Sequence, residues 1–305
     1  MITAVLTDQL GNMMFEYAAV KTIATTKGIP FRYVRATNKL INNVDAKYGC
    51  ELNTIFPIPK EEQLASLPEN ASTYCEPPPH LRDYAEYPKD VYIAISDNTI
   101  VRGFFITPEL IEHNLDNIRK WFTLPESAIS KSREFLQPLR TSGTKICVVH
   151  FRVGHDYFVL GYKLHHTYWK KAAEKVLEQH PNVQFVCVYD KRTSEVESFM
   201  RKFPSVEYHG SLVDDMAMLT QADINIVSNS SFSIMGALLN PNSVMAICPS
   251  IYPTPAGNLP DNTFAKSWIR IPDTKRNLLS RITWTLRKFL KGILPMKLIK
   301  RVLNK

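Results

Sequence analysis

The sequence has no apolar run long enough to cross a lipid bilayer. A membrane-spanning helix needs about 18 or more consecutive apolar residues, and no segment of the 305 residues reaches that length. The N-terminal segment, residues 1–6, carries no basic region and is followed at once by Asp8, which does not fit a secretory signal peptide. We therefore expect a cytoplasmic protein without a transmembrane segment.

Cysteine is scarce and follows no metal-binding or redox pattern. The five cysteines are odd in number, and no two are spaced as Cys-x-x-Cys. Cys147, Cys187 and Cys248 lie inside apolar runs, where a thiol behaves as a small hydrophobic side chain. This pattern predicts a reducing compartment and no disulfide framework.

Acidic residues are absent from the C-terminal segment. Residues 275–305 contain ten of the 37 Lys and Arg residues and no Asp or Glu, which leaves 27 basic and 29 acidic residues in the rest of the chain. A protein that binds nucleic acid carries its basic residues on the folded body, so we expect no nucleic acid as a partner.

The tail, residues 273–305, is predicted to form a basic amphipathic helix. Its apolar stripe consists of Leu278, Leu279, Ile282, Leu286, Phe289, Leu290 and Ile293. Such a helix lies flat on an anionic membrane surface. The alternative is that the stripe packs on the protein body and the basic residues face solvent. A purely basic segment is unusual for a merely solvated helix, so we favour association with a membrane.

Apolar runs alternate with helical patterns, which predicts an α/β fold with parallel sheets. The chain opens with a strand at 2–6, a glycine-containing turn, a helix that ends near Gly28, and a strand at 31–34. Further strands are predicted at 91–95, 100–105, 145–151, 184–188, 224–227 and 244–247, and helices at 108–122, 126–139, 167–179, 194–202 and 216–221. Residues 38–90, rich in proline, are expected to form loops and short elements, and Thr141–Thr144 is the candidate linker.

The serine turn, Ser228-Asn229-Ser230-Ser231-Phe232-Ser233, stands between a predicted strand and a predicted helix. Unpaired N–H groups and the positive end of the helix dipole make such a turn a site for anions, above all phosphate. Ordinary capping requires a single serine, whereas four hydroxyl or amide side chains occur here in a row. From this chemistry alone, phosphate binding and capping explain the turn equally well.

A second polar cluster, residues 150–157, follows the strand at 145–151. His150 and Arg152 are two residues apart and can point the same way out of the sheet. An arginine beside a serine-rich helix start suits a pyrophosphate, whereas the alternative pairs Arg152 with Asp156 and packs His150 at the core edge. Ligands of open α/β sheets bind at the carboxyl ends of strands. We therefore expect both clusters and Leu10-Gly11-Asn12 to share one site.

Three motifs in these clusters resemble those of the α-1,2-fucosyltransferases of glycosyltransferase family 11. They are Gly11-Asn12-Met13-Met14-Phe15, the run from His150 to Tyr157, and Asn229-Ser230-Ser231-Phe232-Ser233. The family patterns are Gly-Asn-Gln-Met-Phe, His-x-Arg-Arg-Gly-Asp-Tyr and Asn-Ser-Ser-Phe-Ser, and the resemblance covers about residues 1–270. Met13 replaces the family's glutamine, Val153 replaces its second arginine, and His155 is inserted.

The resemblance implies an α/β, GT-B-type glycosyltransferase fold with two Rossmann-like lobes. It divides the chain into an acceptor-side lobe at 1–140, a nucleotide-sugar lobe at 141–272 and the tail at 273–305. It implies inverting transfer of L-fucose from GDP-fucose to the 2-hydroxyl of a galactose-terminated oligosaccharide or lipid-linked glycan, such as O-antigen or capsule. The tail would then hold a bacterial enzyme on the cytoplasmic face of the inner membrane.

The resemblance also implies how the phosphates are bound. Arg152 would contact the β-phosphate, and Ser230, Ser231 and the Phe232 N–H would complete the cradle. Gly11 and Asn12 would lie near the fucose and the β-phosphate.

The guanine nucleoside would be held by His150 and by Asp214 or its neighbour Asp215. The alternative role for the two aspartates is to cap the following helix. No Asp-x-Asp occurs, so we expect no metal and no other cofactor, and protein cations and N–H donors would stabilise the leaving GDP.

The general base is left open by the sequence. Asp156 and His155 lie in the middle motif, Glu16 lies one helical turn beyond Asn12, and the donor phosphate is a fourth candidate. Two other functions are considered: a carbohydrate-binding relative with reduced activity, and a protein O-fucosyltransferase. The intact motif residues disfavour the first, and the absence of a signal peptide and of disulfides disfavours the second.

Overall fold

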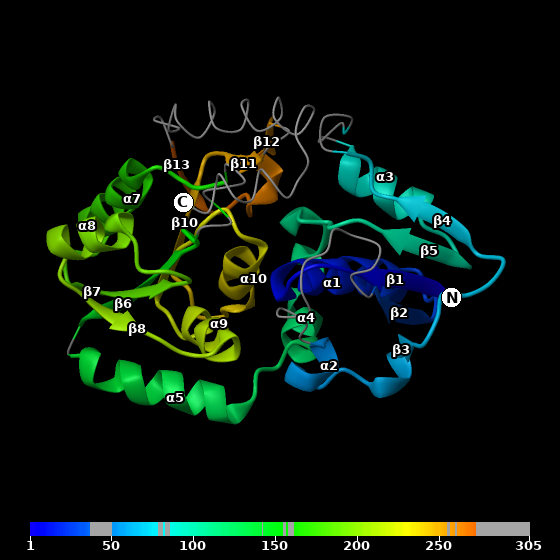
Figure 1. Ribbon diagram of the computed structural model, residues 1–305, viewed down its shortest axis with the longest axis horizontal. Coiled ribbons are helices and arrows are strands. Elements are labelled where there is room, and N and C mark those ends of the chain that lie inside the picture. Colours follow the sequence, from blue (N-terminus) through cyan, green and yellow to red (C-terminus); the bar gives the residue numbers. More distant parts are fainter. Residues whose placement is uncertain are drawn as a thin grey trace, which may run out of the picture.

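Two parallel β-sheets, each flanked by helices, form the two lobes of the computed structural model (Figure 1). The structure describes residues 1–36, 51–78, 82, 86–141, 143–154, 157, 162–254, 257–259 and 261–272. The predicted amphipathic helix at 273–305 lies outside the described residues. Within the described part of the chain, no helix is long and apolar enough to cross a membrane.

The first sheet has the strand order β3-β2-β1-β5-β4, and each neighbouring pair is parallel. Its strands are β1 (Ile2–Leu6), β2 (Phe31–Arg35), β3 (Gln63–Leu64), β4 (Ser72–Cys75) and β5 (Thr99–Arg102). Its helices are α1 (Leu10–Thr26), α2 (Leu52–Ile55), α3 (Tyr87–Ala94) and α4 (Leu115–Trp121). Every residue of β1 is buried, as expected of a central strand covered on both faces.

The second sheet has the order β13-β10-β9-β6-β7-β8 and is also parallel throughout. Its strands are β6 (Lys145–Phe151), β7 (Val183–Tyr189), β8 (Ser205–Tyr208), β9 (Ile224–Ile226), β10 (Met245–Pro249) and β13 (Ile269–Ile271). Its helices are α5 (Glu126–Leu136), α7 (His166–Gln179), α8 (Ser194–Lys202), α9 (Leu212–Thr220) and α10 (Ser231–Leu239). The antiparallel pair β11 (Tyr252–Thr254) and β12 (Gly257–Leu259) lies beside the sheet.

Each sheet has one position at which the order of its strands reverses. In the first sheet the reversal lies between β1 and β5, and in the second it lies between β6 and β9. Open α/β sheets bind ligands outside the carboxyl ends of the strands at this position. The residues that follow β1, β6 and β9 therefore occupy the places where a ligand is expected.

Helices α1 and α10 join the two lobes. They lie side by side at the centre of the molecule (Figure 1), and they contact each other directly. Met13 and Phe15 of α1 belong to the same buried apolar cluster as Ile234 and Met235 of α10. A continuous hydrophobic core therefore fixes the first lobe against the second at the amino-terminal ends of these helices.

Two predicted elements are wrong. Residues 91–94 belong to α3 and Ile95 is its C-cap, so this segment is not a strand: Val91 and Ile95 are buried one turn apart, while Ile93 between them is 68% exposed. A short apolar run does not distinguish a strand from a helix. The predicted helix at 108–122 is broken into the 3-10 turns Pro108–Leu110 and Glu112–Asn114 and the helix α4, because Ile111 has a φ of −124°.

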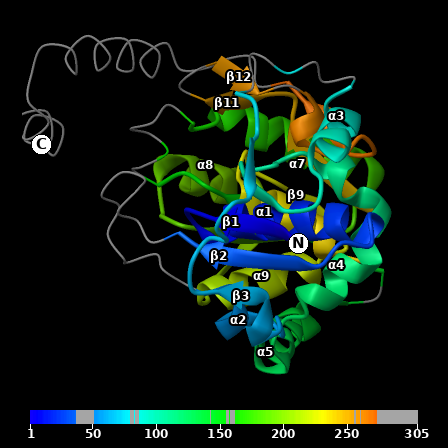
Figure 2. The same cartoon turned by 90° about the vertical axis from the view of Figure 1, so that its right-hand side faces the viewer.

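The strands predicted at 2–6 and 145–151 and the helix predicted at 194–202 are confirmed with the same ends, and the remaining predicted elements are found with shifted ends. The strand expected at 100–105 is β5 and ends at Arg102, because Gly103 and Phe105 have positive φ. The helix expected at 126–139 is α5 followed by the 3-10 turn Gln137–Leu139. Helix α5 packs on α9 and lies below it in Figure 2, and the centroid of the Phe135 ring lies 4.9 Å from that of the Tyr208 ring. Other 3-10 turns are Lys60–Glu62 and Asp261–Thr263.

Candidate functional site

The serine turn connects β9 to α10 at the reversal point of the second sheet. Ser230 is the N-cap residue of α10 and has an extended backbone, yet its side chain makes no capping hydrogen bond. Its side chain is almost fully buried, with a residue exposure of 5%. Capping therefore does not explain the serine at position 230. Of the two explanations for the serine turn, this observation favours anion binding over capping.

The other polar side chains of the turn are held by specific hydrogen bonds. The Ser228 N–H donates to Ser233 Oγ at 3.1 Å, and the Ser231 hydroxyl donates to Asn12 Oδ1 at 2.5 Å. Asn229 Nδ2 donates to the Tyr162 carbonyl at 2.7 Å. The groups available to an anion are therefore the Ser230 hydroxyl and the N–H groups of the first turn of α10, which have no partner within the helix.

Two helix amino termini meet at the serine turn. Gly11, in the first turn of α1, lies so close to α10 that a Cβ atom would stand 2.2 Å from the Phe232 nitrogen. Neither helix has an acidic residue in its first turn. Because both dipoles present their positive ends here, the place favours a negatively charged ligand.

His150, near the end of β6, is buried and faces the turn. Its Nδ1 lies 3.4 Å from Ser228 Oγ, and its ring centroid lies 5.4 Å from that of Phe232. Burial lowers the pKa of His150 to about 4. The imidazole is therefore neutral at pH 7 and can offer a hydrogen bond but not a positive charge.

Arg152, directly after β6, provides the positive charge that His150 does not. Its guanidinium pairs with Asp190, which follows β7, and lies 4.5 Å from the centre of the Tyr157 ring. Asp190 also accepts hydrogen bonds from the N–H groups of Val153 (2.9 Å) and Gly154 (3.0 Å). The Tyr157 hydroxyl donates to the Asn229 carbonyl at 3.1 Å. Tyr157 thus connects Arg152 to the serine turn.

Asp214 and Asp215 have different environments although they are neighbours. Asp214 forms the capping box of α9 with Ser211, and its Oδ2 also accepts from Lys131 Nζ at 2.6 Å. These hydrogen bonds lower the pKa of Asp214 against the opposing effect of its burial. Asp214 therefore has the structural role that was the alternative for it, as the third residue of the helix and not as its N-cap.

Asp215 has the properties of a binding residue. Its Oδ1 is buried and has no hydrogen-bond partner among the described residues. Burial raises the pKa of Asp215 to about 7. A buried carboxylate oxygen without a partner is costly, and a ligand with N–H donors would satisfy it.

His155 and Asp156 lie outside the described residues, so their role as candidate general bases stays a prediction, and the alternative pairing of Arg152 with Asp156 stays a hypothesis. Asp190, which holds Arg152, was missed by the sequence analysis. It directly follows β7, the neighbour of β6, so the rule that ligands bind at strand ends points to it. Asp8, which directly follows Thr7 at the end of β1, was missed although the same rule applies.

Glu16 is a poor general base. It is only 2% exposed, and its two carboxylate oxygens accept hydrogen bonds from Thr7, one from the N–H at 2.6 Å and one from the hydroxyl at 2.5 Å. Burial raises its pKa well above the usual value. Its role is therefore to hold the chain between β1 and α1.

No protein-family model and no curated protein sequence matches the chain. Solved structures do match. NodZ alpha-1,6-fucosyltransferase co-crystallized with GDP gives a TM-score of 0.50 at 14% identity, over 79% of this chain and 92% of that one. Fucosyltransferase NodZ from Bradyrhizobium gives a TM-score of 0.49 at 14% identity, again over 79% of this chain and 92% of that one. POFUT1 in complex with GDP-fucose gives 0.44 at 12% identity, over 79% and 95%.

The likeness is one of fold. The chain shares with the NodZ–GDP structure an α/β architecture, built here from two parallel sheets. The predicted fold class is thus confirmed for the described residues.

Proposed function

We propose that this protein is an inverting fucosyltransferase that uses GDP-fucose without a metal. The observation that carries the proposal is the serine turn: an N-cap hydroxyl that does not cap, at the meeting point of two helix amino termini, connected to Arg152 through Tyr157. This combination suits a diphosphate leaving group, whose charge must be stabilised as the sugar departs. The fold shared with the NodZ–GDP structure is consistent with this donor.

The phosphates of GDP would lie against the serine turn. Ser230 Oγ and the N–H groups of Ser231 and Phe232 would donate to them, and Arg152 would contact the β-phosphate. The Asp190 carboxylate, which also accepts two N–H groups of the loop after β6, would keep the guanidinium in place. Asn12, held by Ser231, would lie near the fucose.

The guanine base would be bound by Asp215 in preference to Asp214. A carboxylate accepts hydrogen bonds from the N1–H and the amino group of guanine, and Asp215 Oδ1 is the buried oxygen without a partner among the described residues. Asp214 is already bound to Lys131 and Ser211. The neutral imidazole of His150 would contact the nucleoside.

The acceptor we propose is the 2-hydroxyl of a galactoside in a surface glycan, on the basis of the motifs shared with family 11. A protein acceptor is the second candidate, because protein O-fucosyltransferases share the Gly-Asn and His-x-Arg features of this sequence. A carbohydrate-binding protein without transfer activity is the third.

The test is to measure GDP release from GDP-fucose with and without lactose, together with GDP binding by calorimetry. We expect GDP to bind, and lactose to accelerate GDP release with formation of a fucosylated product. Binding without release on any galactoside would favour a binding protein or a different acceptor. No binding of GDP or GDP-fucose would contradict the proposed function.

A further inference from the structure

Asp8 is an exposed carboxylate held in an unfavourable backbone conformation at the reversal point of the first sheet. It stands two residues beyond the end of β1 and has a φ of +61°. Residues other than glycine are uncommon in the left-handed region, and such residues cluster at functional sites. Glycine or asparagine would fit this conformation better, so the conformation alone does not explain the carboxylate.

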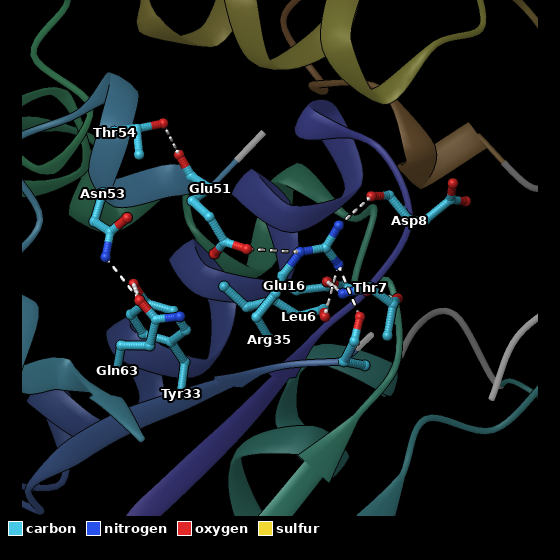
Figure 3. Close-up of polar contacts among 11 residues, drawn as sticks. Leu6, Thr7, Asp8, Glu16, Tyr33, Arg35, Glu51, Asn53, Thr54 and Gln63 are labelled. Atoms are coloured by element: carbon cyan, nitrogen blue, oxygen red, sulfur yellow. Dashed lines mark hydrogen bonds and ion pairs between the residues drawn. The ribbon is translucent and has the colours of Figure 1, made fainter. Parts of the chain in front are cut away.

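Arg35 at the end of β2 fixes the backbone of Asp8. Its guanidinium donates to the Asp8 carbonyl and to the Leu6 carbonyl, both at 3.1 Å. Figure 3 shows the Asp8 side chain directed away from this guanidinium. The Asp8 carboxylate is therefore not used to neutralise Arg35.

The Asp8 carboxylate is instead connected to the serine turn through Asn12. Asn12 Nδ2 donates to Asp8 Oδ2 at 3.0 Å, and Asn12 Oδ1 accepts from the Ser231 hydroxyl at 2.5 Å. In the part of the chain that the structure describes, Asp8 Oδ1 has no hydrogen-bond partner. One oxygen is thus oriented by the donor-site residues, and the other is available to a ligand.

The same carboxylate lies near the second lobe. Its charge contributes to a raised pKa of Tyr162, which is due mainly to burial. The backbone carbonyl of Tyr162 accepts a hydrogen bond from Asn229 of the serine turn. Asp8 therefore lies where the two lobes meet, next to the serine turn and to Tyr162.

Resting on the proposed fucosyl transfer, we propose that Asp8 is the general base that deprotonates the acceptor hydroxyl. The proton passes to Asp8 Oδ1 as the acceptor oxygen forms a bond to C1 of fucose. The bond from C1 to the β-phosphate oxygen breaks, and its electron pair leaves with GDP. The proton is then released to water, so the products are the fucosylated acceptor, GDP and one proton.

Other described carboxylates near the site are less suitable. Both oxygens of Glu16 are occupied by Thr7, and Asp190 pairs with Arg152. Among these residues Asp8 alone combines exposure with an oxygen that has no partner in the described chain. General base catalysis requires this kind of access to the reacting hydroxyl.

The test compares Asp8→Asn with the control Asp116→Asn, an exposed aspartate on α4. Asparagine tolerates the left-handed conformation and still accepts from Asn12, so the fold and the donor site are kept. We expect Asp8→Asn to lower kcat by about 10²-fold or more. Its Kd for GDP-fucose should stay within about twofold of wild type, and its melting temperature within about 2 °C. Asp116→Asn should match wild type.

An acceptor whose reacting hydroxyl is made more acidic by neighbouring fluorine gives a second readout. The ratio of wild-type to Asp8→Asn kcat should be smaller for this acceptor, because a more acidic hydroxyl needs less help from a base. Normal transfer by Asp8→Asn would overturn the proposal. A tenfold weaker Kd for GDP-fucose with unchanged kcat would also overturn it, because Asp8 would then be a donor-site positioning residue. A wild-type protein that neither binds nor transfers fucose would refute the proposed function itself.

Discussion

Gly11 and Phe232 bring the two lobes into contact at a point where no side chain fits between them. A Cβ atom at position 11 would stand 2.2 Å from the Phe232 nitrogen and 2.6 Å from its Cα. The contact joins the first turn of α1 to the first turn of α10. The glycine therefore sets the distance between the helix termini that form the proposed phosphate site.

Gly11→Ala is expected to destabilise the protein by about 1–3 kcal/mol, because the backbone of α10 must move. The sign of this change in stability is diagnostic, because replacing glycine by alanine within a helix otherwise stabilises the helix by up to about 1 kcal/mol. Denaturant unfolding measures the effect, and Thr25→Ala, at an exposed position of α1, is the control. A Gly11→Ala variant as stable as wild type and with normal GDP affinity would contradict the close contact.

Arg152→Ala is expected to lower kcat by about 10²-fold or more, as the loss of one group that stabilises leaving-group charge does. Arg152→Lys should restore activity only in part, because an ammonium lacks the planar fork of the guanidinium. Arg192→Ala is the matched control, since Arg192 pairs with Glu207 on the exposed surface. Near-normal turnover by Arg152→Ala would refute the role of this residue.

Guanosine affinity is expected to depend on pH through Asp215. Its pKa is about 7 in the folded protein, and guanine donors bind the ionised carboxylate, so Kd should rise about tenfold between pH 8 and pH 6. Guanosine is used because it has no phosphate that titrates in this range. Calorimetry of Asp215→Asn should give a Kd that is independent of pH, whereas Asp214→Asn should keep the dependence.

The raised pKa of Asp215 also predicts how the stability of the protein changes with pH. Between the ordinary pKa of 3.8 and the folded value of about 7, the folded state holds a proton that the unfolded state has lost. The free energy of unfolding therefore decreases as the pH rises through this range. Asp215→Asn should raise the melting temperature more at pH 8 than at pH 5. An equal change at both pH values would refute the raised pKa.

Activity is expected to survive treatment with EDTA. Protein groups would supply the charge stabilisation that a divalent cation provides in metal-dependent transferases. Turnover of GDP-fucose is measured before and after chelation, and again after Mg²⁺ or Mn²⁺ is returned. An absolute requirement for either cation would point to Asp214 and Asp215 as metal ligands.

The tail at 273–305 is expected to bind anionic vesicles. Each basic residue near such a surface contributes roughly 1 kcal/mol. In a co-sedimentation assay the full chain should sediment with the vesicles, and a chain that ends at Asp273 should stay in the supernatant. A full-length variant with Arg281, Arg287, Lys288 and Lys291 replaced by glutamine should bind the vesicles more weakly. Equal sedimentation of all three, or unfolding of the shortened chain, would favour a tail packed on the protein body.

Local sequence determined most of the elements and the place of the site. The apolar run of β6, buried on both faces, and the serine turn between a strand and a helix are readable because burial and helix starts leave local patterns. The strand-end rule then brings His150, Arg152 and the turn together. Short elements such as α3 were misassigned because a few apolar residues fit both the helical period and the strand period.

Only the tertiary structure decided which polar residues are available for chemistry. The sequence contains Asp214 and Asp215 side by side, and their different environments come from the fold: Asp214 accepts a hydrogen bond from Lys131, 83 positions away in the chain, whereas burial raises the pKa of Asp215. In the same way, Asp190 reaches Arg152 and Asn12 reaches Ser231 across long stretches of chain. Hydrogen bonding and desolvation depend on neighbours in space, so a one-dimensional pattern does not encode them.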